Sequence, residues 1–119
     1  MASVGVDIVE IKRIESAVNR GRERFLQRVY TQMELKTCRD RLSSLASRFA
    51  AKEAVMKVLG TGGTGIAWRE IEILTADDGR PSVRLHGRAL DKATELNLKE
   101  VSISLSDSRE YAVAVAIGM

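Results

Sequence analysis

Two acidic side chains lie at positions where an unpaired carboxylate would be costly. Asp7 interrupts the apolar stretch SVGVDIV at residues 3–9, and Glu53 falls between Phe49 and Met56 in a helical pattern. A carboxylate beside apolar surface needs a cation. Two carboxylates with lysines nearby suit a Mg²⁺ ion that protein oxygens share with substrate phosphates. Spacing along the chain does not by itself establish that Asp7 and Glu53 meet.

The predicted helix that carries Glu53 also carries three basic residues. Arg48 and Lys52 form one i,i+4 pair, and Glu53 and Lys57 form another, so the members of each pair are neighbours on the helix surface. The ammonium groups of the lysines would neutralise the phosphate charge that the metal ion does not. An ordinary surface ion pair, worth about a few tenths of a kcal/mol, explains the Glu53–Lys57 spacing as well.

The glycine-rich segment 60–65, GTGGTG, matches the dinucleotide-binding pattern G-x-G-x-x-G. That pattern works between a strand and a following helix, because the helix N-terminus faces the pyrophosphate. Here the segment follows a helix and precedes a strand, and neither Lys-Ser nor Lys-Thr comes after it, which argues against a Rossmann site and a P-loop. Two interpretations remain: a loop whose N–H groups line a phosphate, or a helix C-cap and connector.

Length and composition describe one small domain spanning 1–119. No apolar run approaches the roughly 20 residues that a transmembrane helix needs. The N-terminus lacks the basic segment of a secretory signal, so we expect a cytoplasmic protein with no membrane partner. A single cysteine, Cys38, excludes an internal disulfide, and a single histidine, His86, argues against a histidine-based metal cluster. Both are interpreted as structural.

Basic residues concentrate in the first half of the chain. The net charge is +3, yet segment 10–52 holds 11 Lys and Arg against 5 Asp and Glu. Such a surface suits nucleic acid, phosphates or an acidic protein, although solvated helices explain a charge run too. Only 4% of the residues are aromatic. A short chain with so few large side chains would gain burial by oligomerising.

Hydrophobic periodicity predicts an α+β fold, in which a small antiparallel sheet packs against a long helix and shorter helices. Gly21 separates the first two helices, Thr31-x-x-Glu34 is a capping box, and 77–80 is a tight turn. The predicted strands are 3–9, 69–75, 81–85, 100–105 and 111–117; the predicted helices are 10–20, 22–30, one opening near Thr31, 43–59 and 87–96.

The last predicted strand, YAVAVAI at 111–117, is apolar on both faces. One face presents Tyr, Val, Val and Ile, and the other presents three alanines. A strand of this kind is buried on both sides. One face would meet the helices of the same chain. The alanine face would then be covered by a neighbouring subunit, or the strand is simply central within the monomer.

Several stretches together resemble the holo-acyl-carrier-protein synthase family, the small bacterial type of 4′-phosphopantetheinyl transferase. The resemblance covers nearly the whole chain in order, and its most specific parts are the D-I-V-E-x-x-R-I start and the R-F-A-x-K-E-A-x-x-K helix. The matching stretches are VGVDIVEIKRI (4–14), SRFAAKEAVMKVLGTG (47–62), WREIEIL (68–74), GRPSVRLHGRA (79–89) and VSISLSDSREYAVAVA (101–116).

The resemblance implies that the protein transfers 4′-phosphopantetheine from coenzyme A to a serine of apo acyl carrier protein and releases 3′,5′-ADP. It implies that Asp7 and Glu53 bind Mg²⁺ and that Lys57 contacts the phosphates. Glu53, directly or through a metal-bound water, is the candidate acceptor of the serine proton. The usual assembly of the family, a homotrimer with active sites between subunits, would explain the doubly apolar last strand.

The resemblance also assigns binding residues. Arg48, Lys52 and Lys57 would contact the coenzyme, with backbone from the glycine loop and the 79–81 turn at the adenine end. Asp107 stands where many members have a histidine near the coenzyme, so no contact is assigned to it. The loop and turn residues are Gly60, Thr61, Gly62, Gly79, Arg80 and Pro81, and the arginines that would dock the acidic helix of the carrier are Arg13, Arg20 and Arg24.

Two other functions compete with this enzyme. A small basic nucleic-acid-binding module should interleave aromatic residues with basic ones, but only Phe25 and Tyr30 do so, at apolar helical positions. A purely structural oligomer subunit leaves no reason for Asp7 and Glu53 to be carboxylates. The sequence therefore favours the enzyme, with no nucleic acid partner.

Overall fold

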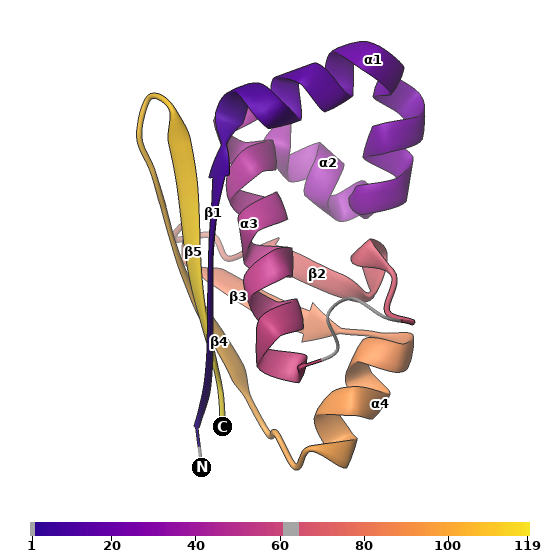
Figure 1. The fold of residues 1–119 in the computed structure, drawn as a ribbon, viewed down its shortest axis with the longest axis vertical. Coiled ribbons are helices and arrows are strands. Elements are labelled where there is room, and N and C mark those ends of the chain that lie inside the picture. The colour runs from indigo at the N-terminus through magenta and orange to yellow at the C-terminus, as the bar shows by residue number, and fades with distance from the viewer. Residues whose placement is uncertain (1, 61–64) are drawn as a thin grey trace.

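The computed structural model describes residues 2–60 and 65–119, and Figure 1 shows how the elements are arranged. In chain order they are β1 (Ser3–Glu10), α1 (Ile11–Val29), α2 (Gln32–Cys38), α3 (Leu42–Leu59), the 3-10 helix η1 (Trp68–Glu70), β2 (Ile71–Thr75), β3 (Pro81–Leu85), α4 (Gly87–Glu95), β4 (Val101–Asp107) and β5 (Tyr111–Gly118).

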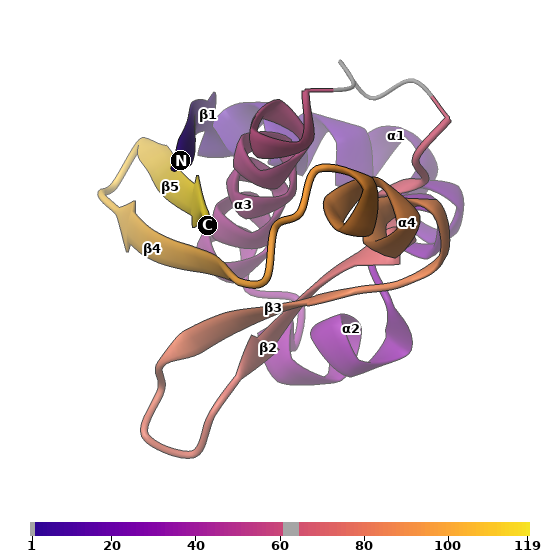
Figure 2. The ribbon, with the colours of Figure 1, turned by 90° about the horizontal axis from the view of Figure 1, so that it is seen from below.

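The main sheet is antiparallel, with strand order β1-β5-β4, so β1 and β4 are its two edges. Asp7 pairs with Ala114 of the central strand. Helix α3 covers one face of this sheet, and β2 and β3 form a separate hairpin beside β4 (Figures 1 and 2). The α+β prediction, with its long helix against a small antiparallel sheet, is confirmed.

The face of β5 that meets α3 is the alanine face. Ala112, Ala114 and Ala116 are fully buried. Small side chains on the strand and on the facing helix let the two backbones approach closely, because little volume separates them. Of the two interpretations of the alanine face, the strand that is central within the monomer is therefore the correct one, and this face needs no cover from a neighbouring subunit.

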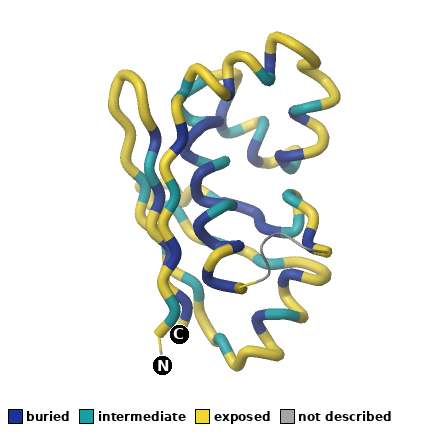
Figure 3. Tube along the Cα trace, viewed as in Figure 1, coloured by how far each residue is buried: buried dark blue, intermediate teal, exposed yellow. Residues whose placement is uncertain are grey.

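The opposite face of β1 and β5 is apolar and uncovered in the single chain. In Figure 3, exposed and half-buried residues alternate with buried ones along these two strands. Single exposed apolar residues are ordinary, but a contiguous group on one sheet face is not. We call this group the apolar sheet face; its exposed members are Val4, Val6, Ile8, Tyr111, Val115 and Ile117.

Local signals in the sequence account for most element boundaries. Gly21 has non-helical backbone angles and kinks α1 at the predicted break. The capping box of α2 is present, since Glu34 N donates to Thr31 Oγ1 and Thr31 N donates to Glu34 Oε1. Segment 69–75 differs, because it begins in η1 and becomes extended only at Ile71. None of the helices in the described residues is long and apolar enough to cross a membrane.

Candidate active site

Asp7 faces α3 at the point where β1 crosses that helix. The buried residues Gly5 and Val9 lie on the same face of β1, one on each side of Asp7. Lys57, from the last turns of α3, donates from Nζ to the carbonyl oxygen of Val6 at 2.7 Å and forms an ion pair with Asp7 Oδ1 at 3.4 Å. The structure therefore brings together one predicted metal ligand and the predicted phosphate contact.

Glu53 lies on α3 near the same crossing. Its side chain is half-buried, and the loss of hydration raises the pKa of its carboxyl group above the usual value of 4.5. The negative charge of Asp7 raises this pKa further, while the cations Lys57 and Arg13 lower it. The charges of Asp7 and Glu53 are therefore near enough to interact, and both lie beside Lys57; metal binding by the two stays a prediction.

The donor set at this crossing fits a magnesium ion. Two carboxylates that repel one another are stabilised together by a divalent cation. In the described part of the chain, no group of three or more His, Cys, Asp and Glu residues is placed to hold a metal. A metal held by Asp7 and Glu53 would therefore complete its shell with water and substrate oxygens, which is the usual binding mode of Mg²⁺.

A second set of predicted residues lines a cavity of about 370 Å³ at the β4 edge. Arg48 is held there by its guanidinium, which donates to Thr75 Oγ1 at 2.8 Å and to Ser47 Oγ at 3.1 Å. Neither hydroxyl was singled out from the sequence, although Thr75 ends a predicted strand. The cavity is lined by Ser47, Arg48, Gly79, Arg80, Pro81, Ile103, Ser104, Leu105 and Asp107.

The turn at 79–81 forms part of the wall of this cavity. Gly79 has a φ of +86°, a left-handed conformation that residues with a Cβ rarely adopt. Arg48 and this turn line the same cavity, and their contact with the coenzyme stays a prediction. Gly60, with a φ of +72°, forms the C-cap of α3, whereas Thr61 and Gly62 lie outside the described residues.

The two sets of residues lie at opposite edges of the main sheet. Asp7 belongs to the edge strand β1, whereas the 370 Å³ cavity takes its lining from the other edge strand, β4. The central strand β5 separates them, as Figure 2 shows. A single chain therefore keeps these two sets of residues apart.

The position of Lys52 argues against the sequence-based prediction that this residue contacts the coenzyme. Its side chain is 0% exposed, as is that of Glu34, to which it is paired at 2.8 Å. Its Nζ also donates to the carbonyl oxygens of Ile71 and Trp68, at 2.6 and 3.1 Å, so all three ammonium protons are used. Burial lowers the pKa of Lys52, and the charge of Glu34 opposes that shift. Lys52 therefore links α3 to α2, η1 and β2 inside the core, and it has no ammonium proton left to donate to a phosphate.

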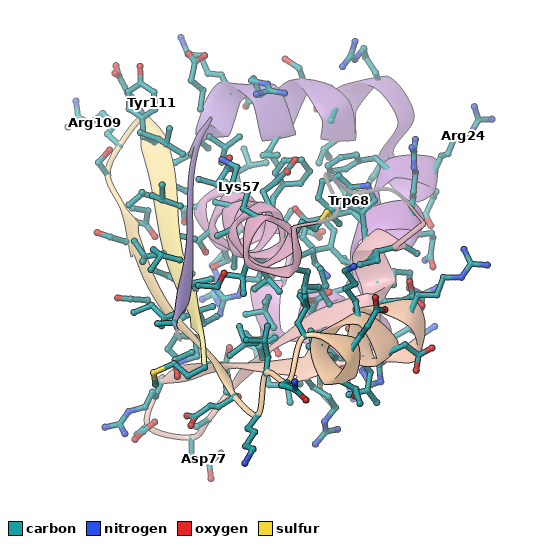
Figure 4. All side chains as sticks on the ribbon, turned by 60° about the horizontal axis from the view of Figure 1, so that its bottom comes forward. Arg24, Lys57, Trp68, Asp77, Arg109 and Tyr111 are labelled. Carbon is teal, nitrogen blue, oxygen red and sulfur yellow. The ribbon has the colours of Figure 1, made fainter. Side chains whose placement is uncertain are left out.

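The predicted docking arginines are divided between two places. Arg13 and Arg20 line a cavity of about 300 Å³ between α1 and α3, with Phe25 and Phe49 at its apolar side. Phe49 also stacks on Trp68, with ring centroids 4.8 Å apart. Arg24 lies beyond the kink of α1, and Figure 4 shows it extending outward, away from Lys57.

Comparisons with known proteins identify the family of this chain. The model of the 4′-phosphopantetheinyl transferase superfamily matches residues 3–116. The chain is 51% identical over 117 residues to the holo-[acyl-carrier-protein] synthase of Dehalococcoides mccartyi, and the match covers 98% of both chains.

Solved structures give the same result. The Helicobacter pylori holo-[acyl-carrier-protein] synthase in complex with coenzyme A has a TM-score of 0.88 and 34% identity, covering 98% of this chain and 99% of that chain. The Bacillus anthracis enzyme in complex with CoA (3′,5′-ADP) has a TM-score of 0.79 and 32% identity, covering 98% and 94%. The chain therefore belongs to the 4′-phosphopantetheinyl transferase superfamily, among the holo-[acyl-carrier-protein] synthases.

Proposed function

We propose that this chain, acting as one domain over 1–119, transfers 4′-phosphopantetheine from coenzyme A to a serine of apo acyl carrier protein. The observation that carries the proposal is the convergence of Asp7, Glu53 and Lys57 where β1 crosses α3. Relatives named for this activity span the whole chain. The alternative, a basic nucleic-acid-binding module, has no support from these relatives.

The 370 Å³ cavity is the proposed coenzyme site. Arg48, already oriented by Thr75, has a guanidinium suited to phosphate oxygens. Arg80 lines the same cavity and adds a second positive charge. The backbone of the 79–81 turn would lie against the adenine end, with the segment Gly60-Thr61-Gly62 as a further proposed contact. A cavity of a few hundred Å³ is the usual size for part of a nucleotide ligand.

Asp7 and Glu53 are the proposed Mg²⁺ ligands. When bound, the ion would neutralise negative charge on the coenzyme diphosphate. Lys57 adds a fixed positive charge at the same place. Its hydrogen bond to the carbonyl oxygen of Val6 holds the ammonium group in place, so this charge needs little reorganisation during the reaction.

The reaction is a phosphoryl transfer. The serine oxygen of the carrier attacks the phosphorus that bears the pantetheine arm, a new P–O bond forms, and the P–O bond to 3′,5′-ADP breaks. Glu53 is the proposed acceptor of the proton of the serine hydroxyl. Lys57 stabilises the negative charge that builds up on the departing 3′,5′-ADP. Positioning and electrostatics supply most of the acceleration in such a reaction.

The two sets of residues at opposite edges of the main sheet explain why we propose a homotrimer. A contact between the β1 edge of one chain and the β4 edge of the next joins different surfaces, and such a contact closes into a ring when the rotation allows it. Each interface would then combine Asp7 and Glu53 of one chain with the Arg48 cavity of its neighbour. The apolar sheet face would be buried in the same assembly.

The carrier is proposed to dock on α1. Arg13, Arg20 and Arg24 would meet the acidic helix of acyl carrier protein, and Arg13 is close enough to Glu53 to lower its pKa. Attraction of this kind speeds association at low salt and weakens as salt rises. The proposed compartment is the cytoplasm, where a free thiol such as that of Cys38 stays reduced.

Mass spectrometry tests the proposal. The protein is mixed with apo acyl carrier protein, coenzyme A and Mg²⁺, and the carrier should gain one phosphopantetheine while 3′,5′-ADP appears. Omitting Mg²⁺ and adding a chelator should stop the gain. An unmodified carrier in the complete mixture, together with salt-sensitive DNA binding that needs no metal, would overturn the proposal.

A further inference from the structure

The crossing of β1 and α3 depends on one small residue. Gly5 is buried against the helix, two residues before Asp7. A Cβ built on Gly5 would overlap the backbone carbonyl oxygen of Ala54 and would lie 3.1 Å from the Cβ of Lys57. The obstacle is helix backbone, which cannot move aside as the end of a flexible side chain can. Any side chain at this position would force β1 and α3 apart.

The three proposed site residues surround this contact. Glu53 comes one residue before Ala54, Lys57 comes three residues after it, and Asp7 comes two residues after Gly5 on the same face of β1. A separation of strand and helix at Gly5 would therefore widen the gap between Asp7 and Glu53. It would also strain the hydrogen bond from Lys57 Nζ to the carbonyl oxygen of Val6.

The width of that gap matters more for some ions than for others. Mg²⁺ requires oxygen ligands at about 2.0–2.1 Å in near-ideal octahedral geometry, whereas Ca²⁺ accepts about 2.3–2.6 Å and irregular shells. A pair of carboxylates held slightly too far apart should thus lose Mg²⁺ while still holding Ca²⁺. We infer that Gly5 is a positioning residue, which sets the Asp7–Glu53 separation to the size of Mg²⁺ by letting β1 touch the backbone of α3. The inference rests on the proposed metal ligands.

The test is the metal preference of Gly5→Ala. Binding of Mg²⁺ and of Ca²⁺ to the free protein is measured by displacement of Mn²⁺, which is followed by electron paramagnetic resonance. Mg²⁺ affinity should fall by about tenfold or more, the range seen when the support of a metal ligand is lost. Ca²⁺ affinity should fall by less than about threefold, because the larger ion spans a wider gap.

Kinetics give a second measurement. In Gly5→Ala, the Mg²⁺ concentration for half-maximal transfer should rise by about the same factor as the dissociation constant. A Mg²⁺ requirement for transfer that matches the wild type would overturn the inference.

Gly118→Ala is the matched control. A Cβ on Gly118 would also meet α3, 2.6 Å from Cγ1 of Val58, but it lies in β5 and away from Asp7. This variant should lose thermal stability and keep the wild-type preference for Mg²⁺ over Ca²⁺. The inference fails if Gly118→Ala shifts the metal preference as well, or if Gly5→Ala binds both ions like the wild type.

Two further variants cover the remaining outcomes. If Gly5→Ala does not fold, Ala54→Ser adds an oxygen atom to a fully buried residue whose backbone meets Gly5. This variant should show the same selective loss of Mg²⁺, and equal loss of both ions would contradict the inference. Glu53→Gln in the otherwise wild-type protein tests the metal ligand itself. If Glu53→Gln binds Mg²⁺ like the wild type, the proposed metal site is wrong. If Glu53→Gln loses Mg²⁺ binding while Gly5→Ala keeps it, only the inference about Gly5 is wrong.

Discussion

The two edges of the main sheet carry different kinds of functional groups, acidic at the β1 edge and basic at the β4 edge. At the β1 edge, Asp7 and Glu53 offer oxygen ligands and a base beside Lys57. At the β4 edge, Arg48 and Arg80 line a cavity that suits an anion. One edge could activate a serine and the other could hold a nucleotide. The proposal of an active site shared between chains rests on this difference between the edges.

The largest expected effect comes from the β1 edge. Glu53→Gln removes the proposed base and one metal ligand, so the transfer rate should fall by roughly a thousandfold. Binding of coenzyme A phosphates at the β4 edge should remain, which calorimetry with 3′,5′-ADP would show. If Glu53→Gln also abolished 3′,5′-ADP binding, the two edges would not be separate sites.

A comparable effect, on stability alone, is expected from the core between the edges. Lys52→Met leaves the carboxylate of Glu34 buried without its cation, which should cost about 3–5 kcal/mol of unfolding free energy. Lys57→Met, at the exposed pair, should cost less than about 1 kcal/mol and yet slow transfer. Urea denaturation and the transfer assay on both variants check this contrast. Similar stability losses in the two variants would contradict it.

A smaller effect is expected from the β4 edge. Arg48→Ala removes charged hydrogen bonds to phosphate, so the KM for coenzyme A should rise by roughly ten- to a hundredfold. The Mg²⁺ dependence should not change. Lys36→Ala, an exposed position on α2, is the charge-matched control and should leave both quantities as they are. An altered Mg²⁺ dependence in Arg48→Ala would contradict the division between edges.

The smallest effect concerns pH. Burial and the charge of Asp7 raise the pKa of Glu53 in the folded state, so its ionisation opposes folding. Stability from this group is complete below its unfolded pKa of about 4.5 and is lost as pH rises through the raised value. In metal-free protein, Glu53→Gln should therefore gain stability relative to the wild type as pH increases across this window. Urea denaturation at several pH values measures it, and a difference that does not vary with pH would show that the pKa is not raised.

Sequence reasoning located the elements well where a local signal exists. The kink at Gly21, the capping box of Thr31 and the Gly79 turn follow from the backbone preferences of single residues. That Asp7 and Glu53 lie close together could be predicted only from the chemical need of each carboxylate for a cation. The spacing gave no support, because it does not relate a strand to a helix more than forty residues away.

Lys52 and Lys57 show where such reasoning stops. Both are lysines of one helix, five residues apart, and each pairs with a carboxylate from another element. One pair is completely buried, and in the other the Lys57 side chain is 54% exposed. The direction of each side chain depends on which side of α3 the sheet covers, which is a tertiary property. The sequence left two interpretations of the alanine face of β5 open for the same reason.

Mixing two inactive variants tests the shared active site most directly. Chains carrying Glu53→Gln are co-refolded with chains carrying Arg48→Glu, and transfer is compared with that of each variant refolded alone. If the two edges of neighbouring chains meet, roughly a quarter of the interfaces in randomly mixed rings combine an intact β1 edge with an intact β4 edge, so the mixture should regain about that share of wild-type activity. A mixture no more active than the two variants separately would show that each chain works without its neighbour.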